Sequence, residues 1–446
     1  KIYKLISVKI NNIKKILKEI LENIDNKNFE KALSILKNSS NIKEDQNLTN
    51  KLFSTIYFKK KDWKKSIEFY LKRIPLEDNK YGILNNIGVA LFNLGKITES
   101  IKNFKNSIYE NNKFDLAYDN LGISYKEIGF YEKSLDCFVN ALKINKNNVS
   151  AKENLLSMFN VIKPQNINLH PIVECNIRIG KIIKNNKPDK NKSNKEIKKI
   201  LGEAENIISS YDMSFDIKET QIFRKNSLNL NCDRHFKVFN EFKIIPKYCF
   251  NCYKIQIELV NVVDLIKLYF LFDNINLKNN NIRKCIVETR DNVKVNYKGY
   301  IYCDGLNEAK DIFEITTKYV SKLDLINHRI FIKHGCSEYA EAYPKYKEIN
   351  LKDTQQEMKY NNNWMKKEKI VDDRTIIRKG EDEKKFSETL KGINLHDIVI
   401  IKNWLNYAKI IGDSSYKEIY EKNINKNFLN NLLINQLDFR KKEFLN

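Results

Sequence analysis

Two cysteines three positions apart, Cys249 and Cys252, are the residues whose spacing most directly suggests chemistry. This spacing lets two thiolates reach one metal ion, or lets two thiols form a redox pair. A structural zinc site needs four ligands, and the sequence has no second pair of this kind. Further thiols must therefore come from elsewhere in the chain. We expect no cofactor as the first interpretation, and a zinc, iron or thiol site at Cys249, Cys252 and Cys336 as the alternative.

Familiar catalytic motifs are absent from the sequence. It contains no G-x-S-x-G, no phosphate-binding loop, no dinucleotide-binding glycine pattern and no H-E-x-x-H. Of the five histidines, His170 and His396 stand beside expected helices, where a capping or surface role is usual. The sequence gives no evidence for an enzyme.

The cysteine pair precedes a run of strand-like and helical segments. Alternating apolar residues predict strands over 253–259, 283–290, 298–303 and 328–333, with helices over 262–274 and 306–323. This βαββαβ order predicts a ferredoxin-like antiparallel sheet with both helices on one face. In that topology one sheet edge gathers Cys252, Cys285, Cys303, His334 and Cys336, with Cys232 and His235 just upstream. Strand parity, however, places Cys285 and Cys303 on the core side, where a thiol acts as a small apolar group.

The other sheet face is expected to be open, and it mixes basic with aromatic side chains. By parity it carries Lys254, Gln256, Glu258, Lys298, Tyr300, Tyr302, Arg329, Phe331 and Lys333. Such a face can stack bases and neutralise phosphates. The run Lys298-Gly299-Tyr300-Ile301-Tyr302 resembles the longer sheet motif of RNA-recognition-motif domains. That resemblance implies RNA as a partner, whereas a structural sheet covered by C-terminal helices is the alternative.

A 34-residue repeat runs through the N-terminal third of the chain. Asn86-Ile87-Gly88 recurs as Asn120-Leu121-Gly122, and the same offset relates Gly95 to Gly129 and Phe104 to Phe138. The repeats occupy about 13–46, 47–80, 81–114 and 115–148, and a capping helix follows over 149–162. Glycine at positions 88 and 122 leaves room for a second helix to lie close, and Gly95 and Gly129 are expected in the turns.

This unit resembles a tetratricopeptide repeat, in which each helix pair stacks on its neighbours to bury its apolar face. The resemblance implies a curved solenoid whose first helices line a groove for another protein, a peptide or a helix. Transferred by phase, the groove residues are Lys51, Phe58, Lys59, Asn85, Val89, Phe92, Asp119, Ile123 and Lys126. Some family members clamp a terminal carboxylate with Lys and Asn at two of these levels. Here the corresponding positions depart from that clamp, so chaperone-tail binding is not expected.

Composition limits the remaining classes of function. The chain has 446 residues, of which 42% are apolar, enough for two or three domains with a sizeable core. The net charge of +23 is spread along the chain and accompanies a general richness in Lys, Asn and Ile. No run of about 18 uncharged apolar residues exists, so no membrane insertion is expected. Eight scattered cysteines do not resemble a secreted disulfide scaffold, and we predict a cytoplasmic protein with reduced thiols. The start of the sequence lacks Met and a signal-peptide pattern, which suggests a fragment.

The fold class expected from these patterns is a multidomain one. An all-α repeat solenoid over 1–162 is followed by a helical joint over 163–210, an α+β ferredoxin-like domain over 211–336 and a helical extension over 337–446. Helices are expected at 171–184 and 194–209 in the joint, and at 351–369, 396–411 and 424–441 in the extension. The predicted function is a non-enzymatic scaffold or adaptor that uses the repeat groove. RNA binding and a metal or thiol-redox site are the two alternatives.

Overall fold

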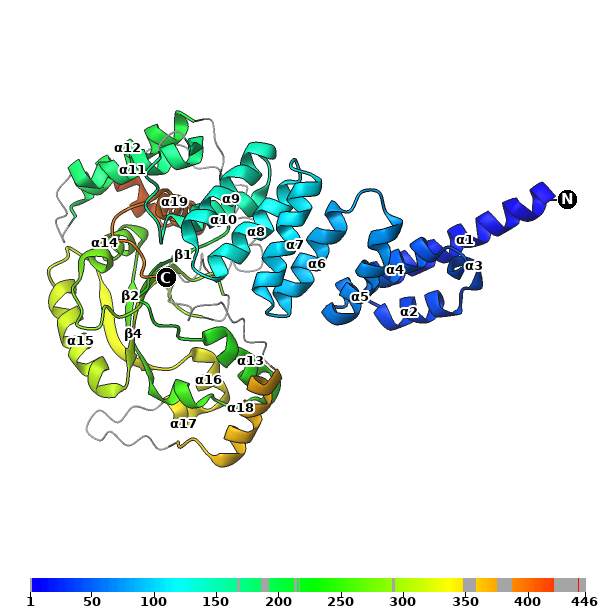
Figure 1. Ribbon diagram of the computed structural model, residues 1–446. Coiled ribbons are helices and arrows are strands. Elements are labelled where there is room, and N and C mark those ends of the chain that lie inside the picture. The colour runs from blue at the N-terminus through cyan, green and yellow to red at the C-terminus, as the bar shows by residue number, and fades with distance from the viewer. Residues whose placement is uncertain are drawn as a thin grey trace. The chain divides into compact units, whose positions relative to one another are not determined.

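The computed structural model describes residues 2–166, 169–185, 192–211, 215, 217–290, 293–347, 358–374, 387–420 and 440. The chain divides into two compact units, the first containing Lys1–Leu155 and the second beginning at Leu156 (Figure 1). The finer four-part division of the chain stays a prediction. Apart from residue 440, the helix expected at 424–441 lies outside the described residues, as does the first part of the one expected at 351–369.

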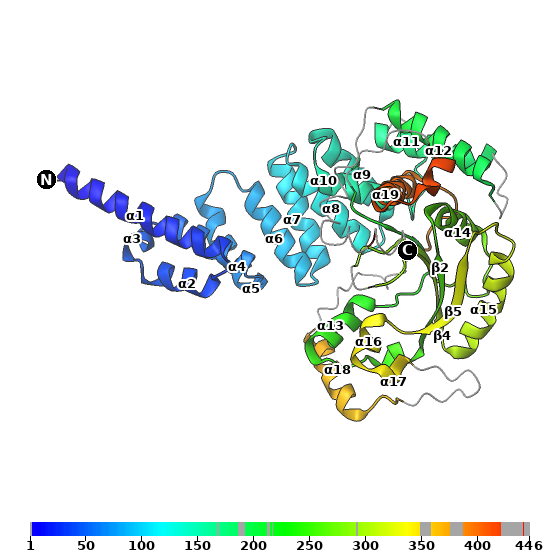
Figure 2. The same cartoon turned by 180° about the vertical axis from the view of Figure 1, so that it is seen from behind.

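The first unit consists of helix pairs. Each pair packs side by side and is followed by the next (Figures 1 and 2). The helices are α1 (Ile2–Asp25), α2 (Phe29–Asn38), α3 (Ser40–Lys43), α4 (Gln46–Lys59), α5 (Trp63–Arg73), η1 (Ile74–Leu76), α6 (Tyr81–Asn93), α7 (Ile97–Glu110), α8 (Asp115–Glu127), α9 (Tyr131–Ile144) and α10 (Val149–Met158). The four repeats are α1 with α2, α4 with α5, α6 with α7, and α8 with α9.

The turn inside each pair has the same geometry in all four repeats. At the corresponding position Lys27, Lys61, Gly95 and Gly129 have φ values of 60°, 63°, 77° and 81°. The next amide donates to the carbonyl five residues back each time, as in Asp62 N to Tyr57 O at 2.9 Å and Lys96 N to Leu91 O at 3.0 Å. This left-handed closure ends the first helix and reverses the chain. The 34-residue spacing is therefore a structural period as well as a sequence period.

Glycine allows the two helices of the third and fourth repeats to approach closely. A Cβ atom added at Gly88 would lie 2.6 Å from the Phe104 ring, and one at Gly122 would lie 2.6 Å from the Phe138 ring. Both rings are buried between the helices. The prediction that these glycines make room for the second helix is confirmed.

The second unit combines a sheet with helices. Its elements are α11 (Pro171–Asn185), α12 (Asn194–Ser209), β1 (Gln221–Arg224), α13 (Cys232–Phe242), η3 (Lys247–Asn251), β2 (Cys252–Leu259), α14 (Val262–Asn274), β3 (Arg283–Val287), β4 (Tyr297–Asp304), α15 (Leu306–Val320), β5 (His328–His334), α16 (Ser337–Ala342), α17 (Pro344–Lys347), α18 (Asn362–Arg374), α19 (Leu395–Ile411) and η4 (Ser414–Glu418). The predicted helices α11, α12, α14, α15 and α19 are confirmed within a few residues. The sequence patterns missed β1, α13 and the short helices α16 and α17.

The five strands form one antiparallel sheet in the order β1-β3-β4-β2-β5. In the register Ile255 of β2 lies opposite Ile301 of β4 and Ile332 of β5. Helices α14 and α15 pack on the same face, because both contact the central strands and each other (Figure 1). Gly299 of β4 permits this packing, since a Cβ atom there would collide with Leu268 of α14. Strand β1 extends the sheet beside β3.

The opposite face of the sheet is not open. Lys254, Gln256, Lys298 and Tyr300 are only 8%, 5%, 1% and 8% exposed. Cys336, which follows β5, covers the Lys254 ammonium at 3.2 Å, and Glu288 pairs with Lys298 at 3.6 Å. The prediction of an open face is therefore wrong for β2 and β4. Tyr302, Phe331 and Lys333 are half-buried, and only Arg329 of the predicted basic and aromatic set is exposed.

A buried charge network joins the sheet edge to two helices. The Arg224 guanidinium of β1 donates to Asp273 Oδ1 of α14 at 2.6 Å and to Asp397 Oδ2 of α19 at 2.9 Å. It also contacts the Tyr269 hydroxyl, which itself donates to Asp397 at 2.8 Å. All four side chains are buried, so these contacts fix β1, α14 and α19 together.

Candidate functional site

In the repeat unit, a ladder of polar side chains joins successive first helices. Asn120 of α8 donates to Asn85 Oδ1 of α6 at 2.9 Å, and Asn154 of α10 donates to Asp119 Oδ1 of α8 at 3.1 Å. Each bond spans 35 residues, about one repeat. Burial raises the pKa of Asp119, and hydrogen bonds from Ser150 and Asn154 oppose that shift. Asn85 and Asp119, both predicted as groove residues, are thus buried residues that hold neighbouring repeats in register.

The other predicted groove residues fall into two groups. Phe58 and Val89 are half-buried and pack against the apolar clusters between helices. Phe92, Ile123 and Lys126 are half-buried on α6 and α8, and Lys51 and Lys59 are exposed on α4. Five of the predicted groove residues, Lys51, Lys59, Phe92, Ile123 and Lys126, are thus exposed or half-buried and belong to no buried cluster among the described residues. These five residues are called the inner set below.

The first helices of the third and fourth repeats pack against each other. Helix α6 packs against α8 as well as against its own partner α7, whereas α7 and α9 have fewer mutual contacts. Stacked units that are narrower on one side curve toward that side. The placement of all first helices on the inside of the curve stays a prediction.

In the second unit, four thiols surround one small enclosed cavity. It is lined by Cys232, Cys249, Cys252 and Cys336 together with Leu230, His235, Phe236, Tyr248, Lys254, Gly335 and Tyr339. The free space is about 10 Å³, on the scale of a single water molecule. Cys249 is buried and its thiol lies 3.8 Å from the Tyr339 hydroxyl. The structure thus brings together the three predicted cysteines and adds Cys232.

Backbone geometry explains how the distant cysteine enters this cavity. Strand β5 pairs with β2, and the Gly335 amide donates to the Cys252 carbonyl at 2.8 Å. Gly335 then turns the chain with φ of 55°. A side chain at this position would also collide with Tyr346, so the turn requires glycine. Cys336 follows directly and faces Lys254.

The histidines near the cavity have structural partners. His235 stacks on Tyr248 with ring centroids 5.3 Å apart, and burial with the neighbouring Arg234 lowers its pKa to about 4. His334 places its two ring nitrogens 2.6 Å from the Tyr346 carbonyl and 3.0 Å from the Phe250 carbonyl. Among the residues that the structure describes, no three His, Cys, Asp or Glu side chains are arranged to hold a metal ion. Metal binding at Cys249, Cys252 and Cys336 stays an untested prediction.

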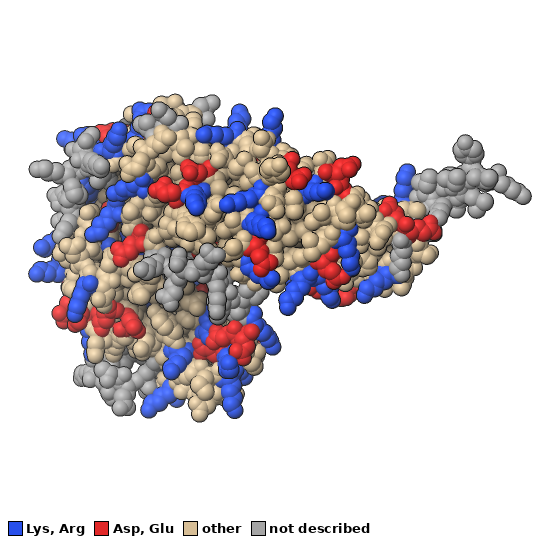
Figure 3. All heavy atoms as spheres, in the orientation of Figure 1, with Lys and Arg blue, Asp and Glu red and all other residues tan. Residues whose placement is uncertain are grey.

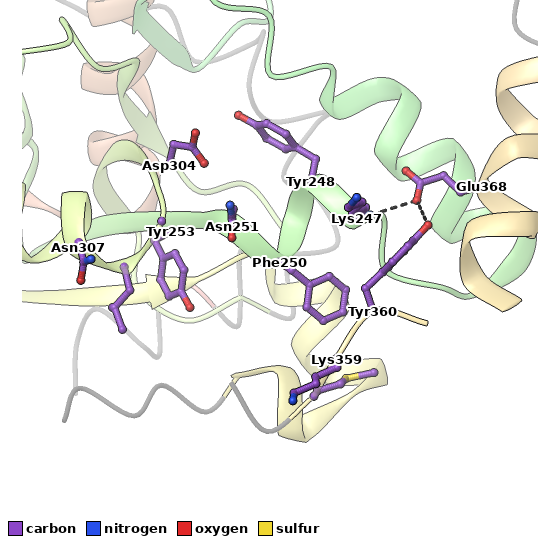
Figure 4. A pocket seen from close by; sticks show the side chains of 13 residues that line it. Lys247, Tyr248, Phe250, Asn251, Tyr253, Asp304, Asn307, Lys359, Tyr360 and Glu368 are labelled. Atoms are coloured by element: carbon purple, nitrogen blue, oxygen red, sulfur yellow. Dashed lines mark hydrogen bonds between the residues drawn. The ribbon is translucent and has the colours of Figure 1, made fainter. Parts of the chain in front are cut away.

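A larger open pocket of about 930 Å³ lies beside the cavity (Figure 4). Its walls come from η3, from the start of α15 and from the segment before α18. Phe250 and Tyr360 meet edge to face at 6.0 Å, and Glu368 accepts hydrogen bonds from the Lys247 amide at 3.1 Å and the Tyr360 hydroxyl at 2.5 Å. Basic, acidic and aromatic groups are mixed here without a nucleophile and base in contact. The pocket therefore indicates no particular reaction.

Sequence reasoning missed two features of the cavity. Cys232 was left outside the predicted site because α13 was not recognised, although its three-residue spacing to His235 was visible. Lys254 was assigned to an open basic face, yet it is buried against Cys336. The charged groups on the view of Figure 3 are interspersed in sign, which agrees with the spread of charge along the sequence.

Comparison with known proteins adds solved structures to this description. No protein-family model matches the chain, and no curated protein matches it. One similar structure is the first TPR of Spaghetti (RPAP3) bound to an HSP90 peptide, at 20% identity and a TM-score of 0.24, covering 25% of this chain and 90% of that chain. YrrB, a TPR protein with an unusual peptide-binding site, is similar at 12% identity and a TM-score of 0.27, covering 43% of this chain and 84% of that one. MamA is similar at 17% identity and a TM-score of 0.30, covering 45% of this chain and 96% of that chain.

The N-terminal unit is an array of tetratricopeptide-type repeats. Its four identical turns and its glycine-to-ring contacts carry this assignment. The C-terminal unit is an antiparallel five-stranded sheet with helices, and its family is not recognised. Among the described residues, no helix is long and apolar enough to cross a membrane.

Proposed function

We propose that the chain is a protein-interaction scaffold and that the inner set of its repeat unit binds a peptide or helix of a partner. The observation that carries this proposal is the set of hydrogen bonds that join successive first helices, Asn85 to Asn120 and Asp119 to Asn154, together with the packing of α6 on α8. In the proposal, the inner set lies on the inside of the curve that these contacts favour. Two of the neighbouring structures are described as peptide-bound or peptide-binding repeat proteins, which is the same kind of use.

The chemistry of the inner set suggests which peptide would fit. Phe92 and Ile123 offer apolar surface on adjacent first helices, one repeat apart. Lys51, Lys59 and Lys126 supply positive charge around them. A segment with apolar anchors and acidic flanks would match this pattern, because apolar anchors give affinity while charges steer and orient the partner.

A peptide-display selection on the full chain tests this proposal. Selected peptides are synthesised and their Kd is measured by calorimetry on the wild type, on Phe92→Ala and on Ile123→Ala. We expect each variant to weaken binding about tenfold or more, as truncation of an apolar anchor does.

Tyr109→Ala is the matched control. Tyr109 lies on the second helix α7, outside the inner set, and is 90% exposed. Its truncation therefore removes more exposed apolar area than truncation of the half-buried Phe92 or Ile123 does. Its Kd should stay within twofold of the wild type. Equal affinity of all three variants, or a loss confined to Tyr109→Ala, would place the binding surface elsewhere.

For the second unit, we propose that β2 to β5 with α14 and α15 form a ferredoxin-like core extended by β1. The strand order and the antiparallel neighbours support this classification. The burial of Lys254, Gln256, Lys298 and Tyr300 argues against the RNA-binding alternative, because these side chains offer little surface on which bases could stack.

A further inference from the structure

The ammonium group of Lys254 is buried beside a thiol. Lys254 is 8% exposed, and its Nζ donates to Cys336 Sγ at 3.2 Å. The Tyr302 ring lies beneath it with the centroid 5.1 Å from Nζ. No carboxylate pairs with Lys254 among the described residues. A buried ammonium without an anion is strongly unfavourable, and in this position it stabilises negative charge that develops on the contacting sulfur during a reaction.

Two further lysines reinforce the positive field around Cys336. Burial and the neighbouring Lys254 lower the pKa of Lys284 to about 8 and that of Lys333 to about 8. Their hydrogen-bond partners are neutral, namely Gln221 Oε1 at 3.1 Å and Ser337 Oγ at 2.6 Å.

The nearby carboxylates are engaged by other cations. Glu288 pairs with Arg290 at 2.9 Å and with Lys298 at 3.6 Å. Glu338 pairs with Arg290 at 2.6 Å. The region around Cys336 is therefore electropositive, and Cys336 itself is only half-buried. Reactive cysteines occupy such partly exposed, positively charged surroundings.

We propose that Cys336, held against the Lys254 ammonium, is a reactive cysteine and that a hydroperoxide converts it into a reversible disulfide with Cys252. Cys252 is the chosen partner because it faces the same cavity and because its carbonyl accepts the Gly335 amide, one residue from Cys336. Burial raises the pKa of Cys252 to about 11, so Cys252 stays a protonated thiol until it reacts.

The chemistry proceeds in two balanced steps. The Cys336 sulfur attacks one peroxide oxygen, the O–O bond breaks, and the departing hydroxide or alkoxide takes up a proton. The Cys336 sulfenic acid is then attacked by the Cys252 sulfur, the S–S bond forms, and the leaving hydroxide combines with the Cys252 proton as water. One hydroperoxide is reduced by two electrons and two thiols are oxidised. Lys254 acts as a positioning residue that stabilises the negative charge on the Cys336 sulfur as it attacks.

The first test measures iodoacetamide labelling of each cysteine in the native full-length protein at pH 7, with peptide mass spectrometry as the readout. Cys232 is exposed and Cys336 is half-buried, so accessibility alone predicts that Cys232 reacts faster. The proposal predicts the reverse by about tenfold, because the Lys254 ammonium contacts the Cys336 sulfur and stabilises the charge that develops when it attacks. Faster labelling of Cys232 would overturn it.

The second test uses Lys254 variants. Lys254→Met should slow Cys336 labelling about tenfold, and Lys254→Arg should restore most of the rate because it keeps the charge. If Lys254 had only a structural role, both substitutions would slow the labelling of Cys336. If Lys254→Met does not fold, the wild-type comparison of Cys336 with Cys232 still decides the question.

Treatment with hydrogen peroxide completes the experiment. We expect a peptide pair linked through Cys252 and Cys336 that dithiothreitol removes, and no such pair in Cys336→Ser. Cys232→Ser should still form it. Elemental analysis of the same sample is included, and stoichiometric zinc or iron that blocks labelling would overturn the proposal in favour of a metal site. These outcomes are independent of peptide binding by the repeat unit.

Discussion

In the repeat unit, the polar contacts between elements recur at intervals of about one repeat, whereas in the second unit they join segments far apart in the chain. Asn85 and Asn120 are 35 residues apart, as are Asp119 and Asn154. Arg224 and Asp397 are 173 residues apart, and Thr220 and Trp404 are 184 apart. A repeat contacts only its neighbours, so its stability is distributed. The second unit instead concentrates its polar contacts in a few buried groups.

This contrast predicts the largest effect at Arg224. Arg224→Ala would leave Asp273 and Asp397 buried without their cation, which costs about 3–5 kcal/mol in comparable sites. We expect the free energy of unfolding of the second unit, measured by denaturant titration, to fall by this amount. Hydrogen exchange should show that the stability of the repeat unit is unchanged.

The surface pair of Arg374 with Glu241 in the same unit supplies the control. Both side chains are substantially exposed, so Arg374→Ala should change the free energy of unfolding by less than about 1 kcal/mol. Equal effects of the two substitutions would mean that the buried network does not stabilise the second unit.

The same contrast explains which parts of the structure could be predicted from the sequence. Gly88, Gly95, Phe104 and their counterparts recur, so four copies of one pattern revealed the helix pairs and their turns. Helix α14 was also predicted with its observed bounds, because its apolar run is a local signal.

Non-local features could not be predicted in this way. Parity along β2 separated Lys254 from Ile255 correctly, but it could not show that Cys336 and its neighbours cover the Lys254 side. The four-thiol cavity likewise depends on α13 folding back toward η3, and the short strand β1 gave no alternating pattern long enough to recognise. In the repeats, phase located the first helices but could not reveal that Asn85 and Asp119 are used to join them.

A second prediction concerns the glycines of the first helices. Gly122→Ala places a methyl group against the Phe138 ring, and overpacking of this kind costs about 1–3 kcal/mol. Gly82→Ala, in the first helix of the preceding repeat, adds the same methyl group where no atom lies within 4 Å. That substitution should stabilise the unit by up to about 1 kcal/mol, because alanine favours helix over glycine. Denaturant titration, with hydrogen exchange in α6 to α9, measures the change in the free energy of unfolding for both variants. A change of the same sign in both would contradict the close glycine-to-ring contact at Gly122.

The smallest effect is expected at the turn of the second repeat. Lys61 has φ of 63° in a position where the third and fourth repeats have glycine. A side chain in this left-handed conformation costs about 1–2 kcal/mol, of which the greater backbone freedom of unfolded glycine cancels part. Lys61→Gly should therefore raise the free energy of unfolding of the repeat unit by about 0.5 kcal/mol, as measured by denaturant titration. Lys64→Gly, three residues further on in α5, should lower it by a similar amount because it places glycine inside a helix. A loss of stability on Lys61→Gly would show that this turn differs from those at Gly95 and Gly129. The four repeats would then not be equivalent.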